Sequence, residues 1–486
     1  MKTVHIVIPE KIGNVSPEIY GHFSELIGGV FYDGLWVGKN SDIPNIRGFR
    51  KDLIEKLREI KPAVLRWPGG CFAETYNWRD GIGENRPVRP SWWTLHDGRY
   101  EKNEVGIHEF MDLCELIGAK AYIAMNVTSI TPMEARNFMD YCLSPRGSTT
   151  LALEREANGR PEPFEIDYWG IGNENWGGGG NMTPEYYALE YRKFATVLKA
   201  ICGNKSKLIL GGADASDYKW THGIMSGLAN SYTTVDGMSF HYYCREGGDA
   251  VNFADDEWYR LINNAGRMEE LIKRHYSIAA GYGMENKAKL VIDEWGCWHP
   301  DGSGPSKGYN LYEQQSTLRD AIVAALTLNI FNNYSEVIIM ANIAQLCNNI
   351  QSLFLASGEH CIVTPTYHVF DMFKDHQGGE ALRVVIDNNE DEKHKISASA
   401  TLKDGTLTVT FANISLEVDE KIDLSLLGCD GVVGECEMTV LSSKDIHSCN
   451  TFEHPNTVVP VTTKVSDCRM ITLPRASIVK LSIKML

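Results

Sequence analysis

Two glutamates occupy matching positions in the chain, each just after a short apolar run. Glu174 follows residues 168–171 and stands between two asparagines, and Glu294 follows residues 290–292 and precedes Trp295. A single glutamate is usually a solvated surface group, but two at strand ends, each near a tryptophan, favour a shared pocket. Retaining glycoside hydrolysis requires two carboxylates about 5–5.5 Å apart, because one protonates the leaving oxygen and the other attacks the anomeric carbon.

Two other kinds of chemistry fit these segments less well. A metal site would need His241, Cys244, Cys297 and His299, whose spacings match no common zinc pattern. Cys71 could be a covalent nucleophile, but the sequence offers no paired base for it. Because paired carboxylates already explain why these segments are polar, we expect neither a metal nor a cofactor.

The elements that must position the glutamates alternate between strands and helices over residues 18–375. Short apolar runs predict strands, and segments with a 3.6-residue period, such as residues 53–60 and 184–201, predict helices. The strand candidates are residues 63–67, 121–125, 168–171, 207–210, 238–240, 290–292 and 337–340. So many strand–helix units favour an α/β fold with a closed (β/α)8 TIM barrel, without excluding an open parallel sheet.

The pattern changes after about residue 376. Residues 396–402 and 406–411 alternate with a period of two on either side of Asp404-Gly405, which predicts a hairpin. Further alternation follows at residues 458–463 and 477–483. We therefore predict a C-terminal antiparallel β-sandwich domain over residues 376–486, completed by a strand from residues 1–17.

The charge balance excludes several classes of partner. The chain of 486 residues carries 47 Lys+Arg against 63 Asp+Glu, a net charge of −16. An acidic surface repels phosphate groups, so we expect no nucleic-acid and no membrane partner, and an uncharged ligand such as a sugar fits better. With no signal peptide, no long apolar run and no CxxC pair among its 12 cysteines, the chain is predicted to be cytoplasmic with reduced thiols.

Eight longer motifs occur in a fixed order along the chain. They are residues 19–25 (IYGHFSE), 65–72 (LRWPGGCF), 76–83 (YNWRDGIG), 172–177 (GNENWG), 239–243 (SFHYY), 293–295 (DEW), 341–345 (ANIAQ) and 364–370 (TPTYHVF). Together they resemble the family 51 glycoside hydrolases, most of which are α-L-arabinofuranosidases. The resemblance runs through nearly the whole chain, and it implies a barrel that carries its acid/base on strand four and its nucleophile on strand seven.

This resemblance implies a role for each matching residue. Glu174 corresponds to the general acid/base and Glu294 to the nucleophile that forms the glycosyl-enzyme. Asn173 would hydrogen-bond the sugar 2-hydroxyl, and Tyr243 would contact the carboxylate of Glu294 and keep it ionised.

The resemblance also implies a set of supporting residues. Glu25 and Gln345 would hold the remaining furanose hydroxyls. Arg66 would lower the pKa of Glu294 by its positive charge, or else pair with a structural acid. His241 would face the pocket, with ordinary packing at a strand end as the alternative.

Three features depart from the family pattern or leave the substrate open. Cys71 stands where many members have asparagine and others cysteine, and a thiol is a weaker hydrogen-bonding group toward a sugar. Residues 91–100 lack the shorter Trp-Gly motif and are expected at the mouth of the pocket. Trp298 would either stack on the leaving-group sugar or pack in the core.

The function implied by the resemblance is a retaining exo-α-L-arabinofuranosidase acting on arabinofuranosyl-containing oligosaccharides. The same resemblance implies a homo-oligomer, often a hexamer. Because a fold does not fix a substrate, a β-1,4-glucanase or β-xylosidase on the same barrel stays an alternative, as does a non-catalytic sugar-binding protein.

Overall fold

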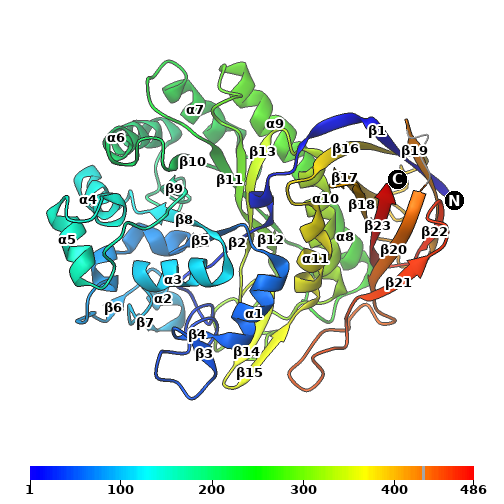
Figure 1. Cartoon of the computed structure of the whole chain (residues 1–486), viewed down its shortest axis with the longest axis horizontal. Helices are drawn as coiled ribbons and strands as arrows, with labels where there is room; N and C mark the ends of the chain where they lie inside the picture. Colours follow the sequence, from blue (N-terminus) through cyan, green and yellow to red (C-terminus); the bar gives the residue numbers. More distant parts are fainter. Residues whose placement is uncertain (429–432, 486) are drawn as a thin grey trace.

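Eight parallel strands form a closed barrel in the computed structural model, which describes residues 1–428 and 433–485 (Figure 1). In order around the barrel they are β2 (Gly21–Phe23), β5 (Val64–Trp67), β8 (Lys120–Met125), β9 (Tyr168–Ile171), β10 (Lys207–Asp214), β11 (Met238–Cys244), β12 (Leu290–Cys297) and β13 (Ile338–Ala344). Side chains of the barrel interior cover one face of each strand and helices cover the other, so the strands are apolar almost throughout. The predicted TIM barrel is confirmed.

One barrel strand, β2, was not among the strands predicted from the sequence. β2 has three residues, too few for a run of apolar residues to stand out, yet it pairs with both β13 and β5 and closes the barrel. Counted from β2, β9 is the fourth strand and β12 the seventh.

The helices surround the barrel and begin at clear sequence signals. Thr183 caps α6 (Pro184–Cys202) through its side chain, and Pro184 at the first turn favours the start of the helix. The helix predicted for residues 184–201 is thus confirmed, as is the one predicted for residues 53–60. The others are α1 (Lys51–Ile60), α2 (Thr94–Asp97), α3 (Ile107–Ile117), α4 (Pro132–Leu143), α5 (Thr150–Ala157), α7 (Tyr218–Leu228), α8 (Asp255–Gly266), α9 (Met268–Gly281), α10 (Leu318–Asn333) and α11 (Pro365–Phe373).

A nine-stranded sheet forms the C-terminal part and holds both ends of the described chain (Figure 1). Its order is β21 (Val461–Val465), β20 (Val433–Ser442), β23 (Ser477–Met485), β18 (Thr406–Asn413), β17 (Ile396–Lys403), β16 (Glu380–Ile386), β1 (Lys2–Asn14), β19 (Glu420–Leu427) and β22 (Met470–Leu473). All neighbours are antiparallel except β1 and β19.

This sheet curls around one apolar core to which strands from both of its ends contribute. The predicted antiparallel domain and its hairpin are confirmed, and Asp404 and Gly405 turn the hairpin with φ of 47° and 72°. The alternation at residues 458–463 is corrected, because the strand there starts at Val461. The domain boundaries at residues 17 and 376 stay a prediction.

Helix α10 joins the barrel to the sheet. It is buried on nearly every side, and Asn329 accepts hydrogen bonds from Ser399 (2.8 Å) and Thr410 (2.7 Å) of the sheet.

The described residues also form three small two-stranded ribbons outside the barrel sheet: β3 (Asn45–Ile46) with β4 (Phe49–Arg50), β6 (Arg89–Pro90) with β7 (Tyr100–Glu101), and β14 (Phe354–Ser357) with β15 (His360–Val363). Short 3-10 helices are η1 (Pro17–Tyr20), η2 (Cys71–Thr75), η3 (Trp78–Gly81) and η4 (Lys374–His376). Among the described residues, every helix is too short or too polar to span a bilayer.

Candidate active site

The two glutamates meet at the carboxyl ends of the barrel strands. Glu174 lies just beyond β9, and Glu294 lies within β12, where it pairs in register with His241 of β11. One carboxylate oxygen of each glutamate and one ring nitrogen of His241 all lie within 4.8 Å of one another. Residues more than a hundred positions apart thus share one small polar pocket.

The backbone at Glu174 is held in a strained conformation. Its φ is +44°, in the left-handed region, which costs a non-glycine residue roughly 1–3 kcal/mol unless its surroundings compensate. The carbonyl of Glu174 accepts hydrogen bonds from the backbone N–H groups of Gly177 (2.8 Å) and Gly179 (3.0 Å). These bonds fold the glycine-rich loop back and leave the carboxylate partly exposed, at 19%.

Glu294 is almost fully buried and doubly hydrogen-bonded. Arg66 donates to Oε1 and the hydroxyl of Tyr243 donates to Oε2, each at 2.7 Å. Burial raises the pKa of Glu294 above its ordinary value, and attraction to His241 and Arg66 offsets only part of this effect. Arg66 therefore lowers the pKa of Glu294 as expected, but the effect of burial is larger, so the pKa stays above its ordinary value.

A third buried carboxylate, Asp293, completes the charged cluster. Its oxygens lie 3.0 Å from His241 Nε2 and 3.7 Å from Arg66 Nε, and Tyr122 donates a hydrogen bond of 2.9 Å. Burial would raise the pKa of Asp293, but the positive charges of Arg66 and His241 hold it below its ordinary value.

His241 is surrounded by carboxylates. Its Nδ1 lies 2.8 Å from Glu174 Oε1 and 3.4 Å from Glu294 Oε2. Burial lowers the pKa of the imidazole, but the charges of Glu294 and Asp293 outweigh burial and raise this pKa well above its ordinary value. With His241 protonated, three acids face two cations, so the cluster is neutral when one acid holds a proton.

Asn173 is oriented by the same arginine. Arg66 Nη2 donates to the side-chain oxygen of Asn173 at 2.6 Å, which fixes the amide so that its nitrogen points toward Cys71, with Nδ2 3.9 Å from Sγ. The side of the amide turned to the pocket is therefore a hydrogen-bond donor.

Glu25 and Gln345 form the opposite wall of the pocket. Glu25 accepts hydrogen bonds from the backbone N–H groups of Gly70 and Phe72 (both 3.1 Å), from Trp93 Nε1 (3.2 Å) and from Gln345 Nε2 (3.2 Å). Burial, with the nearby charge of Glu294, raises the pKa of Glu25 to about 7.

The remaining predicted residues differ in what they contact. The Sγ of Cys71 lies 3.7 Å from Glu174 Oε2, and burial raises the pKa of its thiol, which disfavours the thiolate that nucleophilic attack needs. Trp298 packs edge-to-face on Tyr243 at 5.1 Å, and the guanidinium of Arg245 lies over its ring at 4.2 Å. Arg245 covers one face of the Trp298 ring, and the ring also contacts Tyr312 at 5.0 Å, so Trp298 packs among protein side chains on several sides.

Two glycines let the chain pass between the acids. A Cβ at Gly69 would lie 2.6 Å from the Cγ of Glu25, and one at Gly70 would lie 2.7 Å from Glu294 Oε1. Positions 69 and 70 therefore need glycine because no space is left for a side chain.

Sequence reasoning missed three residues that contact this site. Asp293 was visible only as the neighbour of Glu294, and its inward orientation follows from a register shift between β11 and β12. Trp93 lies within residues 91–100, for which the sequence predicts only a position at the mouth of the pocket. Glu74 follows the Gly-Gly-Cys motif by three residues and is fully buried beneath Asn173.

The metal site considered from the sequence does not form as such. Among residues 1–428 and 433–485, the groups with suitable spacing are Cys297 with His299 and Asp320, and the pair of glutamates with His241. In the first group Asp320 accepts hydrogen bonds from Thr317 N (2.8 Å) and His299 Nε2 (2.9 Å), so it caps α10 and holds His299.

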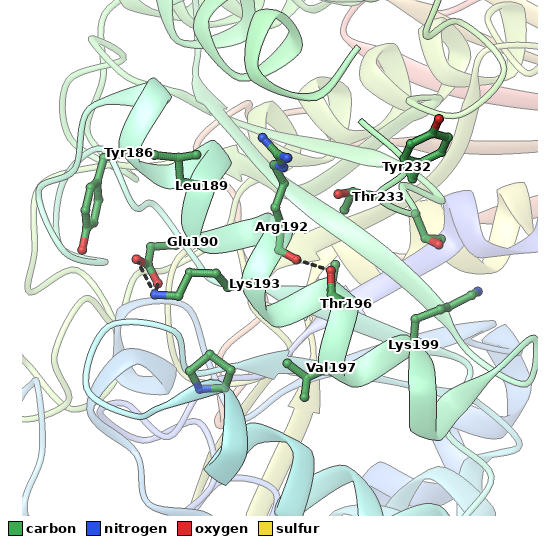
Figure 2. Close-up of a pocket in the computed structure, with 13 residues that line it drawn as sticks. Tyr186, Leu189, Glu190, Arg192, Lys193, Thr196, Val197, Lys199, Tyr232 and Thr233 are labelled. Atoms are coloured by element: carbon green, nitrogen blue, oxygen red, sulfur yellow. Dashed lines mark hydrogen bonds and ion pairs between the residues drawn. The ribbon is translucent and has the colours of Figure 1, made fainter. Parts of the chain in front are cut away.

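A separate groove lies far from these residues on the outer face of α6 (Figure 2). It has a volume of about 980 Å³, and Tyr186, Leu189 and Tyr232 expose much of their side chains there. Its Glu190 pairs with Lys193 on the same helix (Figure 2), and no predicted site residue lines it.

An eight-stranded barrel with two glutamates at the ends of its fourth and seventh strands is the arrangement of barrel glycoside hydrolases. Comparison with known proteins supports the same class of enzyme. Residues 56–260 match the family model described as an α-L-arabinofuranosidase 1 domain, and residues 293–477 match the α-L-arabinofuranosidase C-terminal domain.

Individual relatives identify the family more closely. The chain is 39% identical to an intracellular exo-α-L-arabinofuranosidase of Bacteroides ovatus, over 99% of this chain and 95% of that protein. The family 51 arabinofuranosidase structure from Xanthomonas axonopodis pv. citri superposes with a TM-score of 0.92 at 35% identity, and an arabinose complex from Thermotoga maritima with 0.89 at 26%, both covering each chain completely. The chain belongs to the α-L-arabinofuranosidases of glycoside hydrolase family 51.

Replacing Gly70 by alanine tests the close approach beside Glu294. The added Cβ would displace the Glu294 carboxylate, so we expect kcat/KM on p-nitrophenyl α-L-arabinofuranoside to fall by about 100-fold. The matched control is Gly266→Ala at the end of α8, where a Cβ meets nothing within 4 Å and activity stays at the wild-type level. Equal activity of both variants would contradict the tight fit.

The raised pKa of Glu25 predicts a pH-dependent loss of stability. Because the pKa of Glu25 moves from an ordinary 4.5 to about 7 on folding, its favourable contribution is complete below pH 4.5 and is lost as the pH rises through 7. Relative to Glu25→Gln, the wild type should lose about 3 kcal/mol of unfolding free energy over this range. Denaturant unfolding of both proteins from pH 4 to 8 measures the difference, and a difference independent of pH would refute the shift.

Proposed function

We propose that this protein is a retaining exo-α-L-arabinofuranosidase in which Glu294 is the nucleophile and Glu174 the general acid/base. The observation that carries the proposal is the approach of their carboxylate oxygens to within 4.8 Å. That spacing matches the roughly 5–5.5 Å separation of retaining enzymes and is too short for the 6.5–9.5 Å of inverting ones, which must hold a water between the acids.

The reaction proceeds in two displacements. In the first, ionised Glu294 attacks the anomeric carbon while Glu174 gives its proton to the glycosidic oxygen, so the leaving sugar departs as an alcohol. In the second, Glu174 takes a proton from water, the hydroxyl adds to the anomeric carbon and the ester bond to Glu294 breaks. Each step ends with the same atoms and protons that it began with.

The neighbouring residues support each role. Arg66 and Tyr243 occupy one oxygen each of Glu294 and so fix which lone pair faces the sugar. His241 lies close to both glutamates, and its positive charge favours the ionised form of Glu294. The donor side of the Asn173 amide fits a sugar 2-hydroxyl, a contact that strengthens in the transition state.

The same site suits a terminal furanose. Glu25 and Gln345 offer acceptor and donor groups to its remaining hydroxyls from a buried wall closed by Trp93. We propose terminal α-L-arabinofuranosyl groups of oligosaccharides as the substrate and an intracellular location, in line with the name of the Bacteroides ovatus relative. The homo-oligomer stays a prediction.

Substitution of the nucleophile tests the proposal. Glu294→Ala should reduce release of p-nitrophenol from the α-L-arabinofuranoside by at least about 10⁴-fold, because no first displacement remains. Initial rates on the β-D-xyloside and β-D-glucoside are measured in parallel. Glu190→Ala, which removes a carboxylate from the outer groove of α6, is the matched control and should keep full activity.

Other outcomes separate the alternatives. Release from the xyloside or glucoside alone would keep the two-carboxylate mechanism and refute the furanoside substrate. Wild-type activity in Glu294→Ala would refute the nucleophile.

A further inference from the structure

Glu74 is a fully buried carboxylate that has no part in the mechanism above. It lies in η2, three residues after Cys71, and its exposed fraction is 0%. Oε2 accepts hydrogen bonds from the backbone N–H groups of Val127 (2.9 Å) and Thr128 (3.0 Å). Oε1 accepts from Asn173 N (2.6 Å) and Asn175 Nδ2 (3.2 Å). Glu74 therefore ties together the loops that follow β5, β8 and β9.

The two bonds to Oε1 bracket Glu174. One comes from the residue before it and the other from the residue after it, so a single oxygen fixes the chain on both sides of the acid/base. The Asn175 side chain also donates to the carbonyl of Gly179 at 2.7 Å, which carries the same constraint into the glycine-rich loop. The left-handed backbone at Glu174 persists because these contacts over-determine it.

A carboxylate is the side-chain group that fits the four hydrogen-bonding partners of Glu74. All four groups that hydrogen-bond its oxygens are N–H donors, which fit an ionised carboxylate because it consists of acceptors only. Burial raises the pKa of Glu74 to about 7, and these hydrogen bonds oppose that rise. A glutamine of the same shape would turn an NH2 group toward two of these donors and leave them unsatisfied. Glutamate is thus required for its hydrogen-bonding pattern, not for its size.

We propose that Glu74 is the positioning residue for the general acid/base, because it holds the loop 173–175 so that the Glu174 carboxylate reaches the glycosidic oxygen. This inference rests on the proposed role of Glu174. It predicts that loss of Glu74 impairs proton transfer more than it impairs substrate binding or attack by Glu294.

Glu74→Gln tests the inference through leaving groups. A poor leaving group needs the proton from Glu174, so kcat/KM on an arabino-oligosaccharide should fall by about 100-fold. A good leaving group such as 2,4-dinitrophenolate needs no proton, so kcat/KM on its α-L-arabinofuranoside should fall less than tenfold. With the latter substrate, sodium azide should raise the turnover of the variant and yield arabinofuranosyl azide.

The azide result follows from the second displacement. Azide attacks the anomeric carbon of the glycosyl-enzyme without giving up a proton, so it needs no base, and the bond to Glu294 breaks as before. A variant that is merely misfolded in part loses the same fraction of activity on every substrate and gains nothing from azide.

Glu18→Gln is the matched control. Glu18 is also a buried carboxylate, but it accepts from Ser16, Tyr168 and the ammonium of Lys120 at the opposite, N-terminal end of the barrel strands. Its variant should show one uniform change on both substrates and no azide response. Should Glu74→Gln fail to fold, Asn175→Ala removes the second contact to Oε1 and should show the same leaving-group pattern.

Three results would overturn the inference. The first is an equal loss of kcat/KM on both substrates. The second is full activity of Glu74→Gln. The third is the absence of an azide response in both Glu74→Gln and Asn175→Ala. A wild type that cleaves xylosides or glucosides but not arabinofuranosides would instead refute the proposed substrate, and the same pair of leaving groups on the accepted sugar would still test Glu74.

Discussion

Arg66 and His241 hold three buried carboxylates within one pocket, and the rest of the site depends on that balance of charge. Moving an unpaired carboxylate out of water costs several kcal/mol, so Glu174, Asp293 and Glu294 could not share this space alone. Arg66 reaches Glu294 and Asp293 from β5, and His241 reaches all three acids from β11. Two cations against three acids leave room for one mobile proton, which is what an acid/base cycle uses.

The barrel makes this cluster possible because parallel strands end together. Residues from β5, β9, β11 and β12 arrive at the same edge of the sheet, although they are far apart in sequence. The closeness of the contacts then depends on small details. Gly69 and Gly70 leave space for carboxylates on both sides of the chain, and Glu74 fixes the strained loop that presents Glu174.

The fold and the position of the two glutamates at strand ends could be predicted from sequence because each depends on local patterns. Short, mostly apolar runs mark seven of the barrel strands, whereas β2, with the sequence Gly-His-Phe, gives no such signal. The partners of Glu294 were predictable only through the family resemblance, since nothing local connects Arg66 to a residue 228 positions away. Neither the position of Glu74 beneath the acid/base nor the direction of the pKa of Glu294 could be derived, because both depend on burial in three dimensions.

The stereochemistry of the first product tests the central claim most directly. The wild-type protein is incubated with p-nitrophenyl α-L-arabinofuranoside in water containing methanol, and the products are followed by proton NMR. Two successive displacements at the anomeric carbon predict methyl α-L-arabinofuranoside, with the configuration of the substrate. Formation of the β-configured product would show a single displacement and would contradict the account of Glu294 as a nucleophile beside Glu174.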